Sequence, residues 1–301
     1  MGMSPLDSVL ALLPASAVTR DAPLAPWCTV RVGGSADALV KPQNPDQLVA
    51  VLEQARNARV PISMLGGGAN TLVGDLGVRG VTLKLPADLA PEVIEGPLLT
   101  LCAGSAIARV VTVMKQQKLV GAEFVAGIPG TLGGAVAMNA GTKNGETMTV
   151  VDALELATPD GVGWVPASSL KYEYRHTHLP PGSVVVRVRF KLREGDLAES
   201  QKKMDEDLGY RKRTQPLSQP NFGSVFTNPP GQFAGALIES VKLKGHTIGG
   251  AQISQKHANW IVNLGGAKAA DVVALMTLAQ TRVREATGVE LHPEVKRIGD
   301  F

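Results

Sequence analysis

The chain has 301 residues, of which 44% are hydrophobic and 19% charged, a composition typical of a folded globular protein. At roughly 100–200 residues per domain, this length suggests two domains or three. Thirty basic residues against 27 acidic ones give a net charge of +3, and only 4% of residues are aromatic. These values argue against a nucleic-acid-binding protein, which concentrates basic residues and uses aromatic rings to stack on bases.

The first part of the chain predicts short strands alternating with two helices. Residues 29–43 indicate a short strand, a Gly33-Gly34 turn and a second strand over 38–40. Asn44 begins a helix that runs to about Asn57 with its apolar residues on one face. Ser105 is expected to cap a second helix, with Ile107, Val110, Val111 and Met114 facing inward. Further strands are predicted over 60–65, 81–85 and 98–102.

The second part of the chain predicts another sheet and then a change of composition near Glu194. Strands are expected over 150–157, 163–166 and 184–192. A charged helix over 196–213, a loop over 215–221, a short helix over 233–241 and a long helix over 269–287 follow. The pattern predicts an N-terminal α+β region to about residue 194 and a smaller C-terminal α+β domain.

Cysteine usage and hydropathy point to a cytoplasmic location. Two cysteines, Cys28 and Cys102, are too few for a disulfide framework or a CxxC metal site. We expect two reduced, buried thiols, although a single bridge between them would also fit the sequence. The apolar stretch 9–18 is short, broken by Pro14 and preceded by no positive charge, unlike a signal peptide. No apolar run reaches the roughly 18 residues of a membrane span. We therefore expect a soluble cytoplasmic protein.

Glycine is the informative residue type. The chain has 33 glycines, about 11% against an average of roughly 7%, and they gather in two patches, 66–80 and 121–145. In the first patch a predicted strand ends in three glycines, a pattern that can form an anion-binding nest or a ligand-free turn. It matches neither GxGxxG nor the P-loop pattern. The second patch has mostly small residues, which favours either contact with a flat ring system or tight helix–strand packing.

Three polar residues stand out near these patterns. Arg175 follows Tyr172-Glu173-Tyr174 and could clamp a carboxylate or diphosphate, or be an ordinary surface residue. Ser224, between Gly223 and a hydrophobic run, could be a cap, a core hydroxyl or a proton donor. Glu294 is a single acid placed by Pro293 at the start of an apolar strand. His176 and His178 lack the spacing of a metal site, so we expect no metal.

Taken together and in this order, these motifs resemble the UDP-N-acetylenolpyruvoylglucosamine reductase (MurB) family over roughly residues 25–298. The matching segments are Thr29-Val30-Arg31-Val32-Gly33-Gly34, the triple-glycine loop, residues 127–135, Tyr174-Arg175, residues 223–226, residues 234–239, Leu243-Lys244-Gly245, Gly249-Gly250-Ala251, Ser254 with His257-Ala258-Asn259, and Pro293-Glu294-Val295.

This resemblance implies an α+β fold of the vanillyl-alcohol-oxidase type that binds FAD, rather than a Rossmann fold. The FAD-binding region would span 25–194, in subdomains of about 25–85 and 86–194, and a UDP-sugar domain would span 195–301. The implied enzyme is a monomeric flavoprotein of peptidoglycan precursor synthesis. It uses NADPH to reduce UDP-N-acetylglucosamine enolpyruvate to UDP-N-acetylmuramate, with no membrane or nucleic-acid partner.

The resemblance also assigns roles to individual residues. Arg175 and Glu294 would stabilise negative charge that develops on the substrate, and Ser224 would protonate the substrate carbon. Glu294 would have to carry a proton to help rather than repel. The implied FAD-binding residues are Arg31, Leu65, Gly66, Gly67, Gly68, Ala69, Asn70, Gly127, Ile128, Pro129, Gly130, Thr131, Gly133, Gly134 and Ala135. The implied substrate-binding residues are Asn228, Lys244, Gln252, His257 and Asn259.

The chain departs from the family pattern at three places. Thr227 stands where a lysine is usual, and we hypothesise that Lys244 or the Lys212-Arg213 pair makes the diphosphate or NADPH contacts instead. Thr142-Lys143-Asn144 replaces a segment that often contains a tyrosine, and His292 stands where an acid is common. The alternative function is a flavin-dependent alcohol or sugar oxidase of the same fold; a flavin-binding protein without catalytic activity would be expected to lack Ser224, Arg175 or Glu294.

Overall fold

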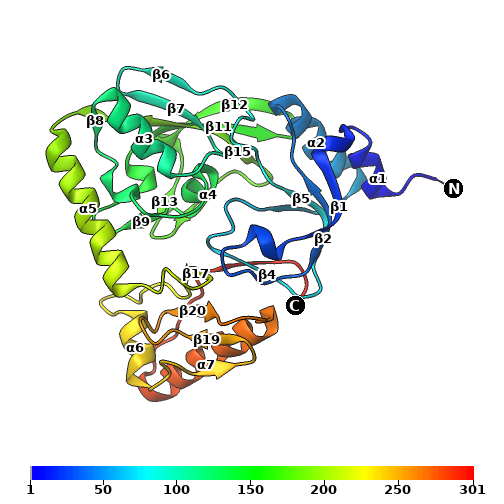
Figure 1. Ribbon diagram of the computed structural model, residues 1–301. Helices are drawn as coiled ribbons and strands as arrows, with labels where there is room; N and C mark the ends of the chain where they lie inside the picture. The colour runs from blue at the N-terminus through cyan, green and yellow to red at the C-terminus, as the bar shows by residue number, and fades with distance from the viewer. Residues whose placement is uncertain (1) are drawn as a thin grey trace. The chain divides into compact units, whose positions relative to one another are not determined.

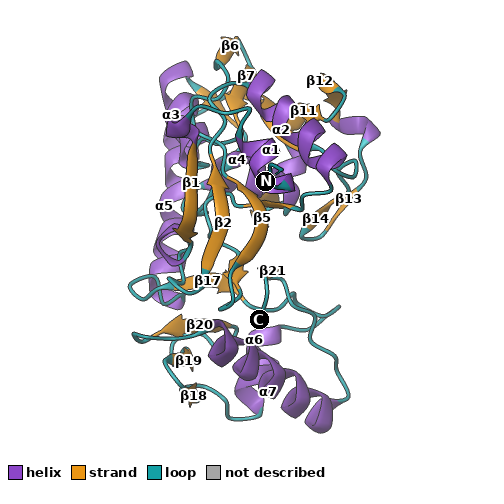
Figure 2. Ribbon diagram, turned by 90° about the vertical axis from the view of Figure 1, so that its right-hand side faces the viewer, coloured by secondary structure: helices purple, strands orange, loops and turns teal. Residues whose placement is uncertain are grey.

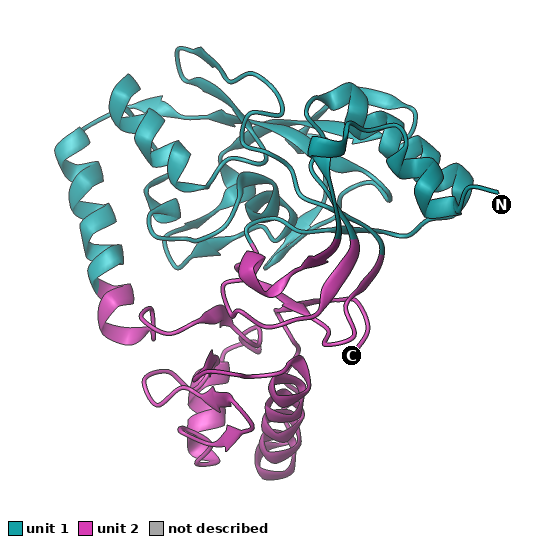
Figure 3. Ribbon diagram, turned by 45° about the vertical axis from the view of Figure 1, so that its right-hand side comes forward, with its two compact units in different colours: residues 1–20, 38–67, 80–209 teal, residues 21–37, 68–79, 210–301 magenta. Residues whose placement is uncertain are grey.

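The computed structural model describes residues 2–301, and contacts within it divide the chain into two compact units. The first unit comprises Met1–Arg20, Ala38–Gly67 and Gly80–Gly209, and the second comprises Asp21–Asp37, Gly68–Arg79 and Tyr210–Phe301 (Figure 3). Each unit is therefore assembled from three separate stretches of sequence. The predicted division into an FAD-binding region over 25–194 and a UDP-sugar domain over 195–301 concerns ligand binding and stays a prediction.

The first unit is built on a five-stranded antiparallel sheet in the order β12-β11-β15-β7-β6. The strands predicted over 98–102, 150–157, 163–166 and 184–192 are all found in it. The sheet strands are β6 (Val93–Glu95), β7 (Leu98–Cys102), β11 (Val151–Thr158), β12 (Gly161–Pro166) and β15 (Val184–Lys191).

Both faces of this sheet are covered, which explains the continuous apolar run at the start of β15. Val186 packs into a cluster with residues of α2, whereas Val188 and Phe190 belong to a second cluster with residues of α3 and α4. A strand buried on both faces needs apolar side chains at successive positions rather than at alternate ones. The helices of the first unit are α1 (Pro5–Leu10), α2 (Pro45–Ala58), α3 (Ala108–Gln117) and α4 (Leu132–Ala137).

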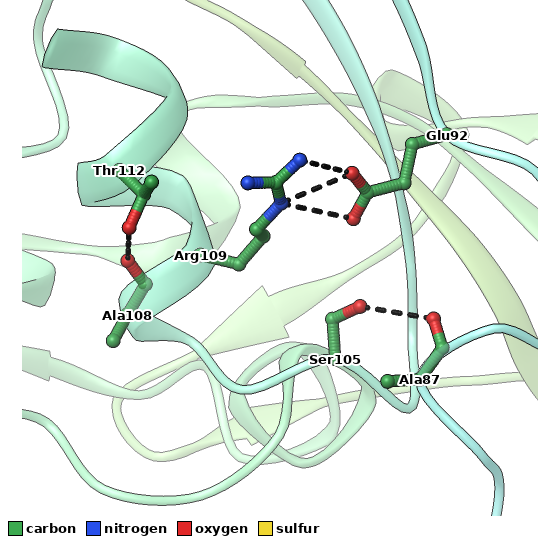
Figure 4. Close-up of polar contacts among 6 residues, drawn as sticks. All are labelled: Ala87, Glu92, Ser105, Ala108, Arg109 and Thr112. Atoms are coloured by element: carbon green, nitrogen blue, oxygen red, sulfur yellow. Dashed lines mark hydrogen bonds and ion pairs between the residues drawn. The ribbon is translucent and has the colours of Figure 1, made fainter. Parts of the chain in front are cut away.

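The predicted N-cap at Ser105 is wrong. The helix begins later, with Ile107 in the N-cap position and no side-chain cap. The Ser105 hydroxyl instead donates to the Ala87 carbonyl at 3.2 Å, and Arg109 pairs with Glu92 with a closest distance of 2.7 Å (Figure 4). These contacts fix α3 to the segment that precedes β6. The inward face also differs, since Val113 is buried and Val111 only partly so.

The first unit also contains β3 and, in addition, three short two-stranded pairs; the sequence pattern did not predict these pairs. Their bounds are β3 (Ile62–Met64), β8 (Leu119–Val120) with β16 (Arg193–Glu194), β9 (Gly141–Thr142) with β10 (Gly145–Glu146), and β13 (Tyr172–Glu173) with β14 (His176–Thr177). Strand β3 confirms the strand expected over 60–65.

Four elements contain a boundary between the units. They are β1 (Val18–Pro23), β2 (Ser35–Val40), β5 (Val78–Leu83) and α5 (Leu197–Thr214). Strands β1, β2, β5 and β3 are neighbours in this order in one sheet, of which Figure 2 shows β1, β2 and β5. The strand predicted at the start of 29–43 is wrong, because none of residues 29–34 is in a strand and Arg31 has a φ of 57°. Strand β1 was not predicted.

The second unit holds a smaller antiparallel sheet in the order β17-β20-β19-β18, and helix α7 lies against β18 and β19 (Figure 2). The long helix predicted over 269–287 has these bounds in the structure, and the predicted short helix is α6. The elements, coloured by position in Figure 1, are β4 (Thr71–Val73), β17 (Asn221–Ser224), α6 (Ala234–Ser240), β18 (Thr247–Ile248), β19 (Ala251–Ile253), β20 (Trp260–Asn263), α7 (Ala269–Thr287) and β21 (Lys296–Ile298).

Three further observations concern the whole described chain. Cys28 and Cys102 are both buried and not disulfide-bonded, as expected. Among residues 2–301, no helix combines the length and the apolar character that a membrane span needs. Over the same residues, no group of three or more His, Cys, Asp and Glu side chains could hold a metal ion.

Candidate functional site: two glycine segments and a serine–glutamate strand pair

In the first unit, the two glycine-rich patches lie backbone against backbone. A Cβ added to Gly67 would come within 2.5 Å of the Gly130 Cα, and one added to Gly66 within 2.8 Å of the Thr131 Oγ1. Only glycine permits this approach, which explains two of the three glycines that follow β3. Lys84 Nζ donates to the Gly66 carbonyl at 2.6 Å and fixes the loop from the other side.

These two segments present main-chain N–H groups that have no protein partner. Among the described residues, the amides of Gly66, Gly67, Gly130 and Thr131 donate no hydrogen bond. Consecutive N–H groups of this kind form an anion-binding nest, and leaving them unpaired away from water would cost free energy. The diphosphate of FAD is an anion that would satisfy these donors, so the residues present fit the expected cofactor.

The second glycine patch is held in place by hydrogen bonds to the start of α3. The Ile107 amide donates to the Gly130 carbonyl at 3.0 Å, and the Gly133 amide donates to the Ala103 carbonyl at 2.8 Å. Thr131 caps α4 by accepting from the Gly134 amide. Ala135 is buried and Ile128 packs on the core, while Gly127 and Pro129 are exposed. The expected FAD-binding residues 127–135 thus form one continuous, braced segment.

Arg175 lies at the tip of a hairpin that is fixed to the same patch. It occupies the turn between β13 and β14 with a φ of 64°, and its Nη2 donates to the Gly141 carbonyl at 3.0 Å. Its guanidinium lies 4.6 Å from the centre of the Tyr174 ring. The hairpin is anchored by the Thr177 hydroxyl, which donates to the Val136 carbonyl of α4 at 2.6 Å.

Asn139 is a buried polar residue that the sequence motifs did not single out. Its Nδ2 donates to the Glu173 carbonyl at 3.1 Å and to Glu146 Oε2 at 2.5 Å, and its Oδ1 accepts from the Met148 amide at 3.0 Å. It therefore connects the end of α4 to the Arg175 hairpin. Its φ of 39°, a conformation in which asparagine is enriched, is invisible in the sequence.

In the second unit, Ser224 and Glu294 are brought onto neighbouring segments. The Glu294 amide donates to the Val225 carbonyl at 2.8 Å, and Phe226 forms a β-bridge with Pro293. The Ser224 side chain is half-buried, and its hydroxyl makes no hydrogen bond to any of residues 2–301. A hydroxyl in this state can donate to a bound ligand.

The rest of the triple-glycine loop belongs to the second unit and meets the same segments. Asn70 Nδ2 donates to the Glu294 carbonyl at 3.1 Å, and Ala69 lies next to Gly223. Gly68 has a φ of 63°, and an added Cβ would collide with the Trp27 carbonyl. The carbonyls of Val30 and Arg31 accept from Asn263 Nδ2. Within this unit, residues 68–70, 223–226 and 293–296 are therefore neighbours.

All five expected substrate-binding residues lie in the second unit. Lys244 pairs with Glu239 at 2.9 Å, and Gln252 Nε2 donates to the Gly245 carbonyl at 3.2 Å. Asn228 Oδ1 accepts from the Ala234 amide at the start of α6. Burial, together with the positive charge of Lys244, lowers the pKa of His257, so the ring is neutral near pH 7. Its Nδ1 accepts from the Asn259 amide, which leaves the Nε2–H as the donor.

Asn259 uses its side chain within the protein. Both polar atoms bond the main chain of Phe226, with the amide of Phe226 donating to Oδ1 at 3.0 Å and Nδ2 donating to its carbonyl at 2.8 Å. The Val225 amide also donates to the Asn259 carbonyl. The structure therefore shows Asn259 fixing Val225 and Phe226, the two residues that directly follow Ser224. The expected contact of Asn259 with substrate stays a prediction.

Two family models match the chain. One, described as the C-terminal domain of UDP-N-acetylenolpyruvoylglucosamine reductase, matches residues 215–298, and an FAD-binding domain model matches 36–163. A UDP-N-acetylenolpyruvoylglucosamine reductase of Myxococcus xanthus is 65% identical, covering 93% of this chain and 91% of its own length. The corresponding protein of an Anaeromyxobacter species is 57% identical, covering 94% and 89%.

A solved structure shows the same similarity as these sequences. The crystal structure of UDP-N-acetylenolpyruvylglucosamine reductase from Thermus caldophilus has a TM-score of 0.81 at 35% identity, covering 94% of this chain and 98% of that one. The chain belongs to the UDP-N-acetylenolpyruvoylglucosamine reductase family. This membership confirms the expected α+β fold with an FAD-binding domain, FAD as the cofactor, and a flavin-dependent oxidoreductase of peptidoglycan precursor synthesis.

The structure shows the contacts of Thr227, which departs from the family pattern, and of Lys244, which was expected to compensate for it. Thr227 Oγ1 lies 3.3 Å from the His292 carbonyl, to which the Thr227 amide also donates, so this side chain is directed at the main chain. Lys244, one of the cations expected to compensate, is paired with Glu239 on the surface. Whether Lys244 or the Lys212-Arg213 pair contacts diphosphate or NADPH stays a prediction.

Proposed function

We propose that this chain uses NADPH to reduce the enolpyruvyl ether of UDP-N-acetylglucosamine enolpyruvate, giving UDP-N-acetylmuramate. The observation that carries this proposal is the pairing of the Ser224 and Glu294 segments, with the Ser224 hydroxyl unengaged by the protein. Family membership and the unpaired amides of the two glycine segments support it. A proton donor and an acid on paired segments suit a reaction that builds negative charge on a small carboxylate.

The reaction adds a hydride and a proton across the vinyl double bond. FAD, held by the amides of Gly66, Gly67, Gly130 and Thr131, would supply the hydride for the terminal vinyl carbon, with its electrons coming from NADPH. The electron pair of the double bond then resides on the adjacent carbon and spreads into the carboxylate. Ser224 donates its hydroxyl proton to that carbon, forming the second C–H bond, and the serine oxygen regains a proton from solvent. A serine is a weak acid, but a carbon-centred anion is basic enough to take its proton.

Arg175 and Glu294 have the complementary task of stabilising the developing charge. Arg175 carries a permanent positive charge and is oriented by the Gly141 carbonyl and the Tyr174 ring. Glu294, in its protonated form, would donate a hydrogen bond to the same charge. Oriented donors of this kind stabilise a transition state because they need no rearrangement when the charge appears.

The remaining assignments are part of the proposal. The diphosphate of FAD would accept from the amides of Gly66, Gly67, Gly130 and Thr131, and the UDP-sugar would contact Lys244, Gln252 and His257. Small molecules are the only partners proposed. The expected monomeric state and cytoplasmic location stay predictions, which light scattering of the purified protein and cell fractionation would test.

A Ser224→Ala variant tests the proposal most directly. In anaerobic stopped-flow experiments, we expect flavin reduction by NADPH to be nearly normal, because Ser224 has no part in it. Reoxidation of the flavin by the enolpyruvyl substrate should slow by about 100-fold or more, the usual effect of losing a proton donor. Ser218→Ala, an exposed serine of the same unit, is the matched control. An equal loss in both half-reactions would show that Ser224 is structural.

An absorbance titration of the unmodified protein tests the function as a whole. We expect flavin bands that NADPH bleaches and that UDP-N-acetylglucosamine enolpyruvate restores in the absence of oxygen. Recovery only after oxygen is admitted would instead favour the oxidase alternative. Failure to bind FAD on reconstitution would contradict both.

A further inference from the structure

Helix α5 is highly charged, yet it buries two polar side chains on one face. Ser200, Met204 and Asp207 are its buried residues, spaced by four and three positions, and they form one stripe along the helix. Ser200 donates its hydroxyl to Glu123 at 2.8 Å. Asp207 is only 8% exposed, and its side chain accepts from Asn144 alone among the described residues. A buried carboxylate with a single neutral partner depends strongly on that partner.

The bond between Asp207 and Asn144 fixes a tight turn. Asn144 Nδ2 lies 2.7 and 3.0 Å from the two Asp207 oxygens, and Asn144 occupies the turn between β9 and β10. In that pair Gly141 faces Glu146 and Thr142 faces Gly145. A Cβ at Gly141 would collide with the Gly145 carbonyl, so the two strands leave no slack. The position of Asn144 therefore determines the position of Gly141.

Two hydrogen-bonded routes lead from this turn to Arg175. The Gly141 carbonyl accepts directly from Arg175 Nη2 at 3.0 Å. Glu146, paired with Gly141, accepts from Asn139, which also donates to the Glu173 carbonyl, two residues before Arg175. All of these residues belong to the first unit. Hydrogen bonds therefore connect both the tip and the base of the Arg175 hairpin to the turn that Asp207 fixes.

We propose that Asp207 and Asn144 are positioning residues for Arg175. They touch no reacting atom; they set the place of the Gly141 carbonyl and, through it, the direction of the guanidinium. This inference rests on the proposed function, in which Arg175 stabilises charge on the substrate. A displacement of about 1 Å in such a group can lower a rate by up to about 100-fold. We expect a roughly tenfold effect, because the Asn139 route remains when the Asp207–Asn144 bond is lost.

The test uses Asn144→Ala and Asp207→Ala in the full-length holoenzyme. Both variants should reoxidise their flavin with the enolpyruvyl substrate about tenfold more slowly, while reduction by NADPH stays within about twofold of the wild type. Asp207→Asn keeps an oxygen that can accept from Asn144 and should restore most of the rate. Ser200→Ala removes a comparable buried hydrogen bond from the same face of α5 and should lower the melting temperature without this selective loss. Equal slowing in Ser200→Ala would overturn the proposal.

A double-variant cycle decides whether the effect passes through Arg175. Adding Asn144→Ala to Arg175→Ala should slow reoxidation little further, because the group being positioned is already gone. A full further tenfold loss would overturn the proposal. If Asp207→Ala does not fold, Asn144→Ala, in an exposed turn, carries the same test. Wild-type flavin that the substrate cannot reoxidise would overturn the proposed function itself, whereas normal wild-type turnover with unchanged variants would overturn this inference alone.

Discussion

The glycine segments of the first unit and the serine–glutamate pair of the second unit present different atoms to a ligand. Around Gly67 and Gly130 the donors are main-chain amides, and side chains are excluded because two backbones nearly touch. Around Ser224 and Glu294 the main chains of the two segments bond to each other, so the groups offered to a ligand are the two side chains. The two regions should therefore respond to opposite kinds of mutation.

This difference changes how a substitution to alanine is interpreted. At Ser224 or Glu294 alanine removes a reacting or stabilising group and leaves the backbone unchanged. At Gly67 alanine adds an atom where none fits and removes no chemical group. A loss of activity in the first region thus reports on chemistry, and in the second on binding of the cofactor.

Glu294 should give the largest effect, in the region that acts through side chains. We expect Glu294→Ala to slow flavin reoxidation by substrate about 100- to 1000-fold, the usual result of removing one donor from a charge-stabilising site. Glu294→Gln, which keeps a hydrogen-bond donor, should lose less. Single-turnover kinetics measure both, with Glu285→Ala on the exposed face of α7 as the control. Glutamine and alanine variants with the same rate would contradict a donor role.

Gly67 should give the next largest effect, by added volume. A Cβ there would stand 2.5 Å from the Gly130 Cα, a backbone atom with little freedom to move. Overpacking of this kind costs about 1–3 kcal/mol, so Gly67→Ala should bind FAD roughly 10- to 100-fold more weakly. Gly163→Ala, where nothing lies within 4 Å, is the matched control. Flavin fluorescence quenching measures the dissociation constants, and unchanged affinity in Gly67→Ala would show that the segments do not hold the cofactor.

Substitution of His257 should give the smallest effect. It tests the stability of the second unit rather than its chemistry. Burial lowers its pKa below 6.5, and Lys244 adds to this, while Glu239 opposes it. As pH falls below about 6.5, the unfolded chain takes up a proton before the folded one, so His257 makes stability decline from there towards its lowered pKa. Above pH 6.5 the ionisation of His257 does not make stability change with pH. Urea unfolding of the wild type and His257→Gln should diverge only on the acid side; parallel curves would contradict this.

The elements that the sequence predicted well are those with a regular apolar pattern and a clear end. Helix α7 and strand β7 have the expected bounds, and α2 begins after Asn44, whose side chain accepts from the Gln47 amide. Strand β1 carries no such pattern, because most of its residues are exposed. The apolar residues Val30 and Val32 suggested a strand. Both are buried, but they lie in a segment that forms no strand and in which Arg31 has a positive φ.

The candidate site divides in the same way. Glycine density in the sequence indicated the two patches, but only the structure shows Gly67 against Gly130. Ser224 and Glu294 stood out in the sequence and received their roles from the family resemblance, but the pairing of their segments depends on a β-bridge between residues far apart in sequence. Asn139 and Asp207 were missed because a single polar residue gives no periodic signal, and its importance lies in burial and partners.

The hydrogen bond from Asn70 to Glu294 also has a consequence for biosynthesis. Its partners are 224 residues apart. Strand β4 likewise pairs with β21, a parallel strand that is synthesised much later. At about 5–20 residues per second, the ribosome needs roughly 10–45 s to make the intervening chain. During that time residues 68–79 are present without the partners that bury Leu72 and Val73, and such unpaired strand edges invite aggregation. The second unit must therefore fold late, and its earliest-made segments are the ones that most need chaperone protection.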